Sequence, residues 1–191
     1  MAHESTKSMR RRMKEEPEFW KKIFVGSGID VGAGDDCLSG CQPFDMPHGD
    51  ANYLSRYFPE GRFDYLHASN CLEHMRDPRC AMLEWIRVVK PGGRLIITVP
   101  DWSGYERLRY PSVTNPDHKA SFSMIHFGSL FPIHIHIPSF LKELEPYATT
   151  VRAEYIERNF KWKLPPHIDQ TWNLEDAVEL WNEFVLVKKS P

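Results

Sequence analysis

The segment from Phe63 to Pro100 constrains the fold of this chain more than any other. Phe63–Ala68 is a short apolar run typical of a buried strand. Asp77-Pro78 then indicates a helix start, with an N-cap residue followed by proline in the first helical position. One buried helix face is predicted by apolar residues at i, i+3, i+4 and i+7, namely Met82, Trp85, Ile86 and Val89.

The helix is expected to end at Lys90–Gly93, where proline and two glycines turn the chain. Arg94–Pro100 is then a continuous apolar strand of the kind found in parallel sheets. Strand, helix, turn and strand form a βαβ unit. We therefore predict an α/β fold with a Rossmann-like, mostly parallel sheet flanked by helices.

Short strands on either side extend this sheet. Ile29–Gly34 is an apolar run that ends in glycines, and Gln42–Asp45 is a second short segment. Only about eight residues separate Gly34 from Gln42, whereas a parallel crossover normally needs a dozen or more. We expect an abbreviated first crossover and a vestigial third strand before Phe63. Two late segments, 149–155 and 181–187, predict an antiparallel C-terminal strand pair.

The chain has 191 residues, which suits one full domain. We assign residues 1–24 to a helical N-terminal arm that restarts at Pro17, and residues 25–191 to a single Rossmann-like domain. Residues 101–138 are rich in proline, tyrosine and histidine and predict a lid or acceptor segment. The arm is basic, and such a charge run is expected to be a solvated helix face.

Composition and charge limit the kinds of partner and cellular location that we expect for this chain. The formal net charge of -2 gives no support to binding along a nucleic-acid backbone. No segment approaches the ~20 apolar residues of a membrane span. The polar N-terminus has no apolar signal-peptide core, so we expect a cytoplasmic protein whose four cysteines are reduced. The oligomeric state is not predicted.

A strand that ends in Gly-x-Gly lets the backbone approach a ligand closely. Gly32 and Gly34 fit that pattern, and Asp45 ends the next strand, where an acid can hold the ribose hydroxyls of a nucleoside. Asp35 and Asp36 follow the glycines and would repel the pyrophosphate of a dinucleotide. The positive sulfonium and amino groups of S-adenosylmethionine tolerate these acids, so the local charge favours that cofactor over NAD.

Residues Gly28–Asp101 resemble the class I S-adenosylmethionine-dependent methyltransferases, especially small domains of the ubiquinone-biosynthesis and sugar-modifying type. The matching pieces are Ile29–Gly34, Gly49–Ala51, Phe63–Tyr65, Asn70–His74, Asp77-Pro78 and Arg87–Gly93. The resemblance implies a cofactor site with the methionine part at Asp30, Gly32 and Gly34, the ribose at Asp45, the adenine at Asp50 and Ala51, and the reactive methyl at Ser69 or Asn70.

The acceptor side is expected in residues 101–138, where His118, His126, His134 and His136 lie. Histidine suits a general base near neutral pH. We take His118 and His126 as the catalytic candidates, His118 first because its polar neighbours indicate an open loop. His134 and His136 alternate as in a strand and would share one face.

A metal site is not expected. Some relatives bind a divalent metal through Glu-x-x-Glu-His, but here Asn70 takes the place of the first glutamate. Glu73 and His74 are instead expected to cap and orient the following helix.

These observations lead to one hypothesis and two alternatives. The hypothesis is methyl transfer from S-adenosylmethionine to a small molecule or saccharide, at oxygen or nitrogen. The first alternative is a non-catalytic binding module that keeps the fold, which the short 34–42 connection favours. The second is a nucleic-acid methyltransferase, which rests on the basic arm.

Overall fold

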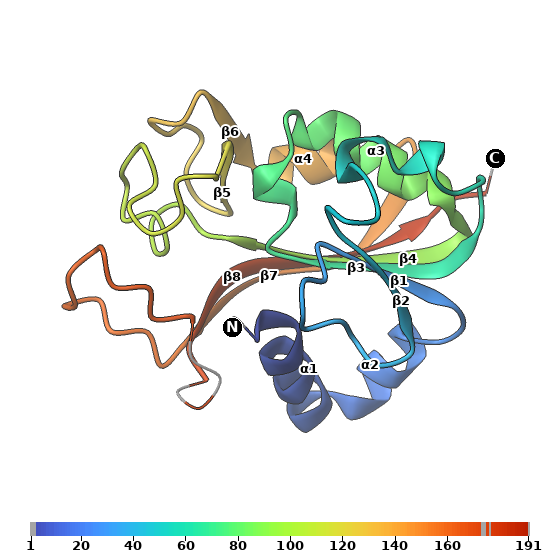
Figure 1. The fold of residues 1–191 in the computed structure, drawn as a ribbon, viewed down its shortest axis with the longest axis horizontal. Coiled ribbons are helices and arrows are strands. Elements are labelled where there is room, and N and C mark those ends of the chain that lie inside the picture. The colour runs from blue at the N-terminus through green and yellow to red at the C-terminus, as the bar shows by residue number, and fades with distance from the viewer. Residues whose placement is uncertain (1–2, 173–174, 176, 191) are drawn as a thin grey trace.

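A six-stranded sheet runs through the centre of the computed structural model, which describes residues 3–172, 175 and 177–190 (Figure 1). Its order is β2-β1-β3-β4-β8-β7. The strands are β1 (Gly28–Val31), β2 (Cys41–Phe44), β3 (Phe63–Ser69), β4 (Val89–Pro100), β7 (Ala148–Arg158) and β8 (Glu179–Lys188). Strands β2, β1, β3 and β4 are parallel, and β8 is antiparallel to both β4 and β7. The predicted Rossmann-like sheet and its antiparallel C-terminal pair are confirmed.

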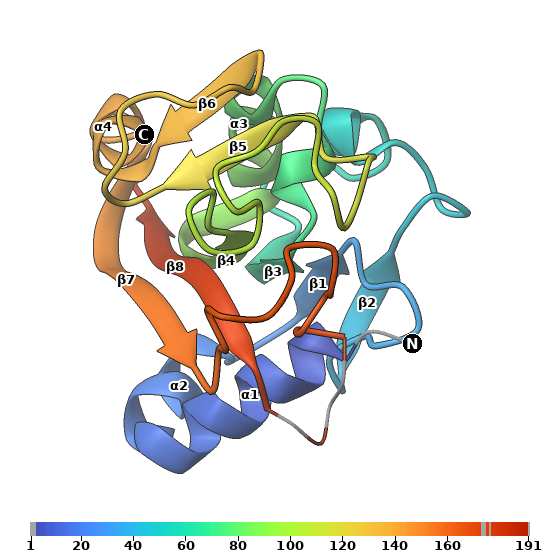
Figure 2. The same ribbon diagram turned by 90° about the vertical axis from the view of Figure 1, so that its left-hand side faces the viewer.

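Helices cover both faces of the sheet (Figures 1 and 2). On one face lie α3 (Pro78–Val88) and α4 (Ile137–Glu143), and on the other lie α1 (Glu4–Glu15) and α2 (Pro17–Ile23). The predicted break at Pro17 separates α1 from α2. Because side chains alternate along each strand, every central strand contributes one set of residues to each helical layer.

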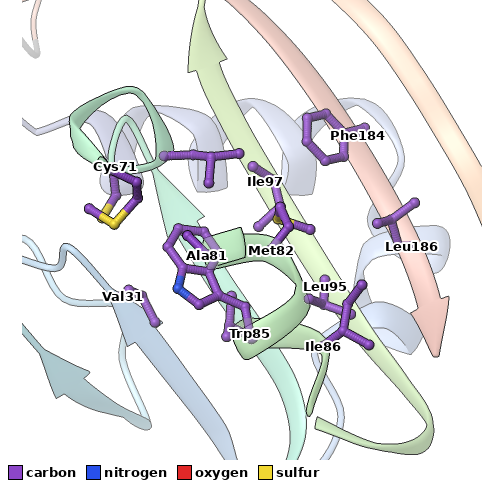
Figure 3. Close-up of a cluster of buried hydrophobic side chains, with 14 of the residues drawn as sticks. Val31, Cys71, Ala81, Met82, Trp85, Ile86, Leu95, Ile97, Phe184 and Leu186 are labelled. Atoms are coloured by element: carbon purple, nitrogen blue, oxygen red, sulfur yellow. The ribbon is translucent and has the colours of Figure 1, made fainter. Parts of the chain in front are cut away.

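The main core lies between α3 and the sheet (Figure 3). Asp77 caps α3 by accepting hydrogen bonds from the backbone of Arg79 and Cys80. The predicted apolar face of α3 is buried, and the Trp85 side chain is completely inaccessible to solvent. Strand β4 begins at Val89 rather than at the predicted Arg94, because Val89 pairs with Phe63 before a bulge that shifts the register.

The abbreviated first crossover is confirmed. Residues 32–40 join β1 to β2 without a helix, and a single 3₁₀ segment, η1 (Ala51–Arg56), lies between β2 and β3. No further strand occupies that interval, all of which the structure describes. The glycine turn after β1 is therefore followed by loop rather than by a helix N-terminus.

Residues 101–138 contain more structure than predicted. Strands β5 (Ala120–Ser123) and β6 (Ile133–His136) form a small parallel sheet beside α3 and α4 (Figure 2). Phe122 and Ile135 are fully buried in the main core. Residues 101–138 are thus anchored to the domain by the apolar residues of β5 and β6, which the irregular sequence of the flanking loops did not predict.

The N-terminal helices form a layer of the domain rather than an arm. Trp20 and Ile23 pack on the sheet against Tyr65, Ile96 and Val185. The expectation of a solvated basic face is wrong for three residues of α1, since Lys7, Arg11 and Arg12 are 3%, 7% and 0% exposed. The reason is that β8 presents Glu179 and Glu183 on the same face of the sheet, and both accept hydrogen bonds from the arginines.

Two smaller findings complete the fold. The four cysteines are free thiols. Among the described residues, every helix is too short or too polar to cross a bilayer.

Candidate active site

The glycine turn after β1 has the backbone that the sequence predicts. Gly32 and Gly34 have φ values of 75° and 50°, in the region that favours glycine. A Cβ on Gly32 would lie 2.6 Å from the Cβ of Cys71, so no other residue fits there. The backbone N–H of Gly34 donates to Asp45 Oδ2 at 2.7 Å, which ties the turn to the end of β2.

A cavity of about 750 Å³ opens at the carboxyl ends of β1, β2 and β3. This edge is where ligands bind in open α/β sheets. Five of the eight predicted cofactor residues line the cavity: Gly32, Asp45, Asp50, Ala51 and Asn70. The structure therefore assembles one pocket from segments that the sequence analysis selected separately.

The other three predicted cofactor residues do not line this cavity. Asp30 is fully buried, with Oδ1 2.7 Å from His67 Nδ1 and Oδ2 accepting from the Leu38 backbone. The Ser69 hydroxyl is buried and accepts from Thr98 Oγ1. Gly34 contributes only its hydrogen bond to Asp45. These three residues form hydrogen bonds to neighbouring segments and do not themselves line the cavity.

The charge of the cavity suits a cationic ligand. Asp50 accepts hydrogen bonds from the backbone and side chain of Asn52, and these bonds lower the pKa of its carboxyl. Asp45 adds a second carboxylate. The loop that follows Gly34 offers no helix N-terminus for a pyrophosphate. The buried amide of Asn70 has no partner in the described structure and is available to a ligand. S-adenosylmethionine, with its sulfonium and amino groups, fits this donor set.

Sequence reasoning missed several residues of the same cavity. Cys71, His74 and Arg76 follow β3, while Asp117 and Lys119 belong to the loop before β5. The first three lie in or beside a piece that resembles the family and could have been found by position. Asp117 and Lys119 reach the cavity only through tertiary packing, and nothing in their local sequence marks them.

A second cavity, of about 470 Å³, lies next to the first. The two share Asn70 and His74 as lining residues. Its other lining residues are Glu4, Glu73, Pro100, Tyr105, Thr114, Asn115, His118, Asp169, Trp172 and Trp181. His118, the first catalytic candidate, therefore lies where the sequence analysis expected an acceptor.

His118 is buried and held by two acids. Its Nδ1 hydrogen-bonds to Glu106, and its Nε2 lies 3.8 Å from Glu73 Oε1. Burial by itself would lower the pKa of His118, but Glu106 and Glu73 outweigh this effect and raise it. Neither carboxylate oxygen of Glu73 has a hydrogen-bond partner in the described structure, and burial raises the pKa of this carboxyl. The expected capping role is wrong, because Asp77 caps α3.

The structure does not bring the two catalytic candidates together. The His126 ring packs against Trp102, and the backbone carbonyl of His126 lies 2.8 Å from His134 Nε2. His126 lines neither cavity. His134 and His136 lie on β6 as predicted, where they contact Ser121 and Ser139.

Sequence comparison finds a methyltransferase-domain family model that matches residues 30–97. Residues of this chain are also 37% identical, over 54 positions, to an uncharacterized 37.1 kDa protein in transposon TN4556 of Streptomyces fradiae. That match covers 28% of this chain and 15% of the length of that protein.

Solved structures share the fold over nearly the whole chain. An S-adenosylmethionine-dependent methyltransferase from Archaeoglobus fulgidus superposes with a TM-score of 0.57 at 16% identity, covering 98% of this chain and 95% of its own. The 1,6-didemethyltoxoflavin-N1-methyltransferase of Burkholderia thailandensis, solved with bound 1,6-didemethyltoxoflavin and S-adenosylhomocysteine, gives a TM-score of 0.51 at 14% identity, covering 96% of this chain and 86% of its own. A chain from the complex between the Haloferax volcanii Trm112 methyltransferase activator and a methyltransferase gives 0.52 at 13% identity, covering 98% and 96%.

At these identities the structural matches establish the fold, and the family match adds the methyltransferase domain. Residues 30–97 therefore match a methyltransferase domain, and the chain shares its fold with solved S-adenosylmethionine-dependent methyltransferases.

Proposed function

We propose that this chain transfers the methyl group of S-adenosylmethionine to an oxygen or nitrogen of a small polar molecule or saccharide. One observation carries the proposal: the cavity that fits the cofactor and the cavity that contains His118 share Asn70 and His74. A methyl donor in the first cavity and an acceptor in the second would meet at these residues.

The proposed cofactor position follows the lining residues. The Gly32 turn would face the methionine part, Asp45 the ribose, and Asp50 with Ala51 the adenine. When bound, the cofactor supplies an electrophilic methyl group on a sulfonium. The acceptor's lone pair forms the bond to the methyl carbon while the carbon–sulfur bond breaks and its electron pair stays on sulfur. Alignment is the main contribution of the protein to such a displacement.

The acceptor must also lose its proton on the side of the second cavity. His118 is the catalytic candidate that the structure brings there, held by Glu106 behind it and facing Glu73. We propose that His118 acts on the acceptor group, and His126 has no proposed role because it lines neither cavity.

The walls of the second cavity support a small polar acceptor. Tyr105, Trp172 and Trp181 provide aromatic surfaces, which pack against the apolar faces of rings and sugars. Glu4, Glu73 and Asp169 provide carboxylates that can accept hydrogen bonds from hydroxyl or amino groups. The described residues that line this cavity include no lysine or arginine to contact phosphates, so a nucleic-acid acceptor is disfavoured.

The test is calorimetric titration with S-adenosylmethionine and, separately, with S-adenosylhomocysteine. We expect micromolar binding of both. Asp50→Ala should weaken it roughly 10- to 100-fold, the effect of losing a hydrogen bond to a charged group of about 1.5–3 kcal/mol. Glu145→Ala is the matched control, because its carboxylate is exposed and lies outside both cavities. If folded wild-type protein bound neither compound, the proposal would be refuted and a non-catalytic binding module favoured.

A further inference from the structure

Glu73, His74 and His118 converge at the boundary between the two cavities. One ligand atom from each of the three side chains lies within 4.8 Å of the others. His118 Nε2 is 3.8 Å and His74 Nε2 is 3.9 Å from the same oxygen, Glu73 Oε1. These separations are too long for hydrogen bonds, so the three groups approach one another without bonding directly.

In both histidines an acidic residue holds the ring in place through a hydrogen bond at Nδ1. His118 Nδ1–H donates to Glu106, and His74 Nδ1–H donates to Asp117 Oδ2 at 2.9 Å, since a carboxylate can only accept. In the neutral form of each ring, with its proton on Nδ1, Nε2 carries a lone pair and lies within 3.9 Å of Glu73 Oε1. This carboxylate–histidine arrangement is the usual support of metal-binding histidines.

Glu73 has a buried carboxyl group that accepts no hydrogen bond from any described residue. The residue is 0% exposed, and both carboxylate oxygens lack a partner in the described structure. The side-chain amide of Asn70 is also buried, and neither its nitrogen nor its oxygen forms a hydrogen bond in the described structure. Glu183, which is equally buried, instead accepts hydrogen bonds from two arginines. An unpaired buried carboxylate is costly, and a bound cation would remove that cost.

We infer that Glu73, His74 and His118 form a binding site for one divalent first-row transition-metal ion. Two imidazoles and one carboxylate suit Zn²⁺, Mn²⁺, Fe²⁺ or Co²⁺, whereas Mg²⁺ and Ca²⁺ prefer all-oxygen sites. In a tetrahedral site, bonds of about 2.0–2.2 Å place ligand atoms about 3.3–3.6 Å apart, so a pair separated by 4.8 Å would have to close by about 1.2–1.5 Å. The sequence analysis expected no metal because Asn70 replaces the first glutamate of the Glu-x-x-Glu-His motif; His118, from a distant segment, is the third ligand proposed here.

The role of this ion rests on the proposed methyl transfer. An ion at this position faces both cavities and can bind an acceptor oxygen beside the methyl group. It would lower the pKa of that hydroxyl and hold it in line for attack. His118 then contributes through its bond to the ion rather than as a free base. The site therefore favours a hydroxyl acceptor over a nitrogen acceptor.

The test uses the full chain after dialysis against a chelator, without S-adenosylmethionine. Mn²⁺ is added, and the loss of the free-ion electron paramagnetic resonance signal reports binding, with Zn²⁺ as competitor. We expect one ion per chain, displaced by Zn²⁺, and almost no binding in Glu73→Gln or His118→Gln. Glu106→Gln, which leaves the three ligands in place, should weaken binding about 10- to 100-fold. His136→Gln, a histidine outside the cluster, is the matched control and should bind as wild type.

Thermal unfolding provides a second readout, because an ion that binds the folded state raises its midpoint. Mn²⁺ should raise the midpoint of wild type and His136→Gln but not that of Glu73→Gln. Absence of binding by folded wild type, or equal binding by wild type and Glu73→Gln, would overturn the metal site. S-adenosylhomocysteine binding in the same samples separates the two proposals: if it persists while metal binding fails, only the metal site is refuted.

Discussion

The buried side chain of Arg12 joins the N-terminal helix to the sheet, and its truncation tests how the two are held together. Its Nε and Nη2 donate to Glu183 Oε2 at 3.0 and 2.6 Å, and its Nη1 lies 3.1 Å from His67 Nε2. The guanidinium also lies 4.9 Å from the centre of the Trp20 ring. Arg12 and Glu183 are both 0% exposed, so solvent screens none of this interaction.

Arg12→Ala would leave the Glu183 carboxylate buried with Arg11 as its remaining arginine, 2.8 Å away. Removing one partner of a buried ion pair costs about 3–5 kcal/mol. We therefore expect the free energy of unfolding to fall by about 3–5 kcal/mol, a large part of the ~5–15 kcal/mol that a domain has. Surface ion pairs, by contrast, contribute about 0–1 kcal/mol.

The assay is urea unfolding at neutral pH, followed by tryptophan fluorescence. Arg10→Ala is the matched control, because Arg10 is an exposed arginine on the same helix; its effect should stay within about 0.5 kcal/mol. Glu183→Gln and the double variant complete a mutant cycle, in which the double variant should cost less than the sum of the single variants. A loss below about 1 kcal/mol for Arg12→Ala, or additive effects, would refute the reasoning.

Two further predictions concern local features. Asp77→Ala should destabilise the fold by about 0.5–2 kcal/mol through loss of the α3 cap, whereas Asp77→Asn, which can still cap, should be nearly neutral in the same urea assay. Burial raises the pKa of Glu4 from 4.5 to about 7, so the folded state keeps a proton that the unfolded state releases. Stability from this group is present below pH 4.5 and lost as the pH rises through 7. Glu4→Gln should therefore be more stable than wild type only at the upper end of this range; equal pH dependence of the two urea midpoints would contradict the assignment.

The sequence determined the parts of this protein that depend on residues near one another in the chain. The strand from Phe63, the Asp77 cap and the apolar face of α3 follow from short-range periodicity and backbone preference, and the structure confirms them, whereas the turn predicted at residues 90–93 lies within β4. The same holds for the Gly32 turn, whose positive φ and close approach to Cys71 require glycine. Five of the predicted cofactor residues meet in one cavity because each follows a parallel strand or lies at the start of η1, where Asp50 is the N-cap.

Only the tertiary structure decided which polar residues are buried and what they face. The basic sequence of α1 would look the same if its arginines faced water or if they faced buried acids. Glu183, the acid that Arg12 binds, lies 171 positions further along the chain. Glu73 and His74 are adjacent, but His118 and Glu106 complete their cluster from another segment. Charge and hydrogen bonding act through space, and a linear pattern records a side chain's chemistry without its distant neighbours.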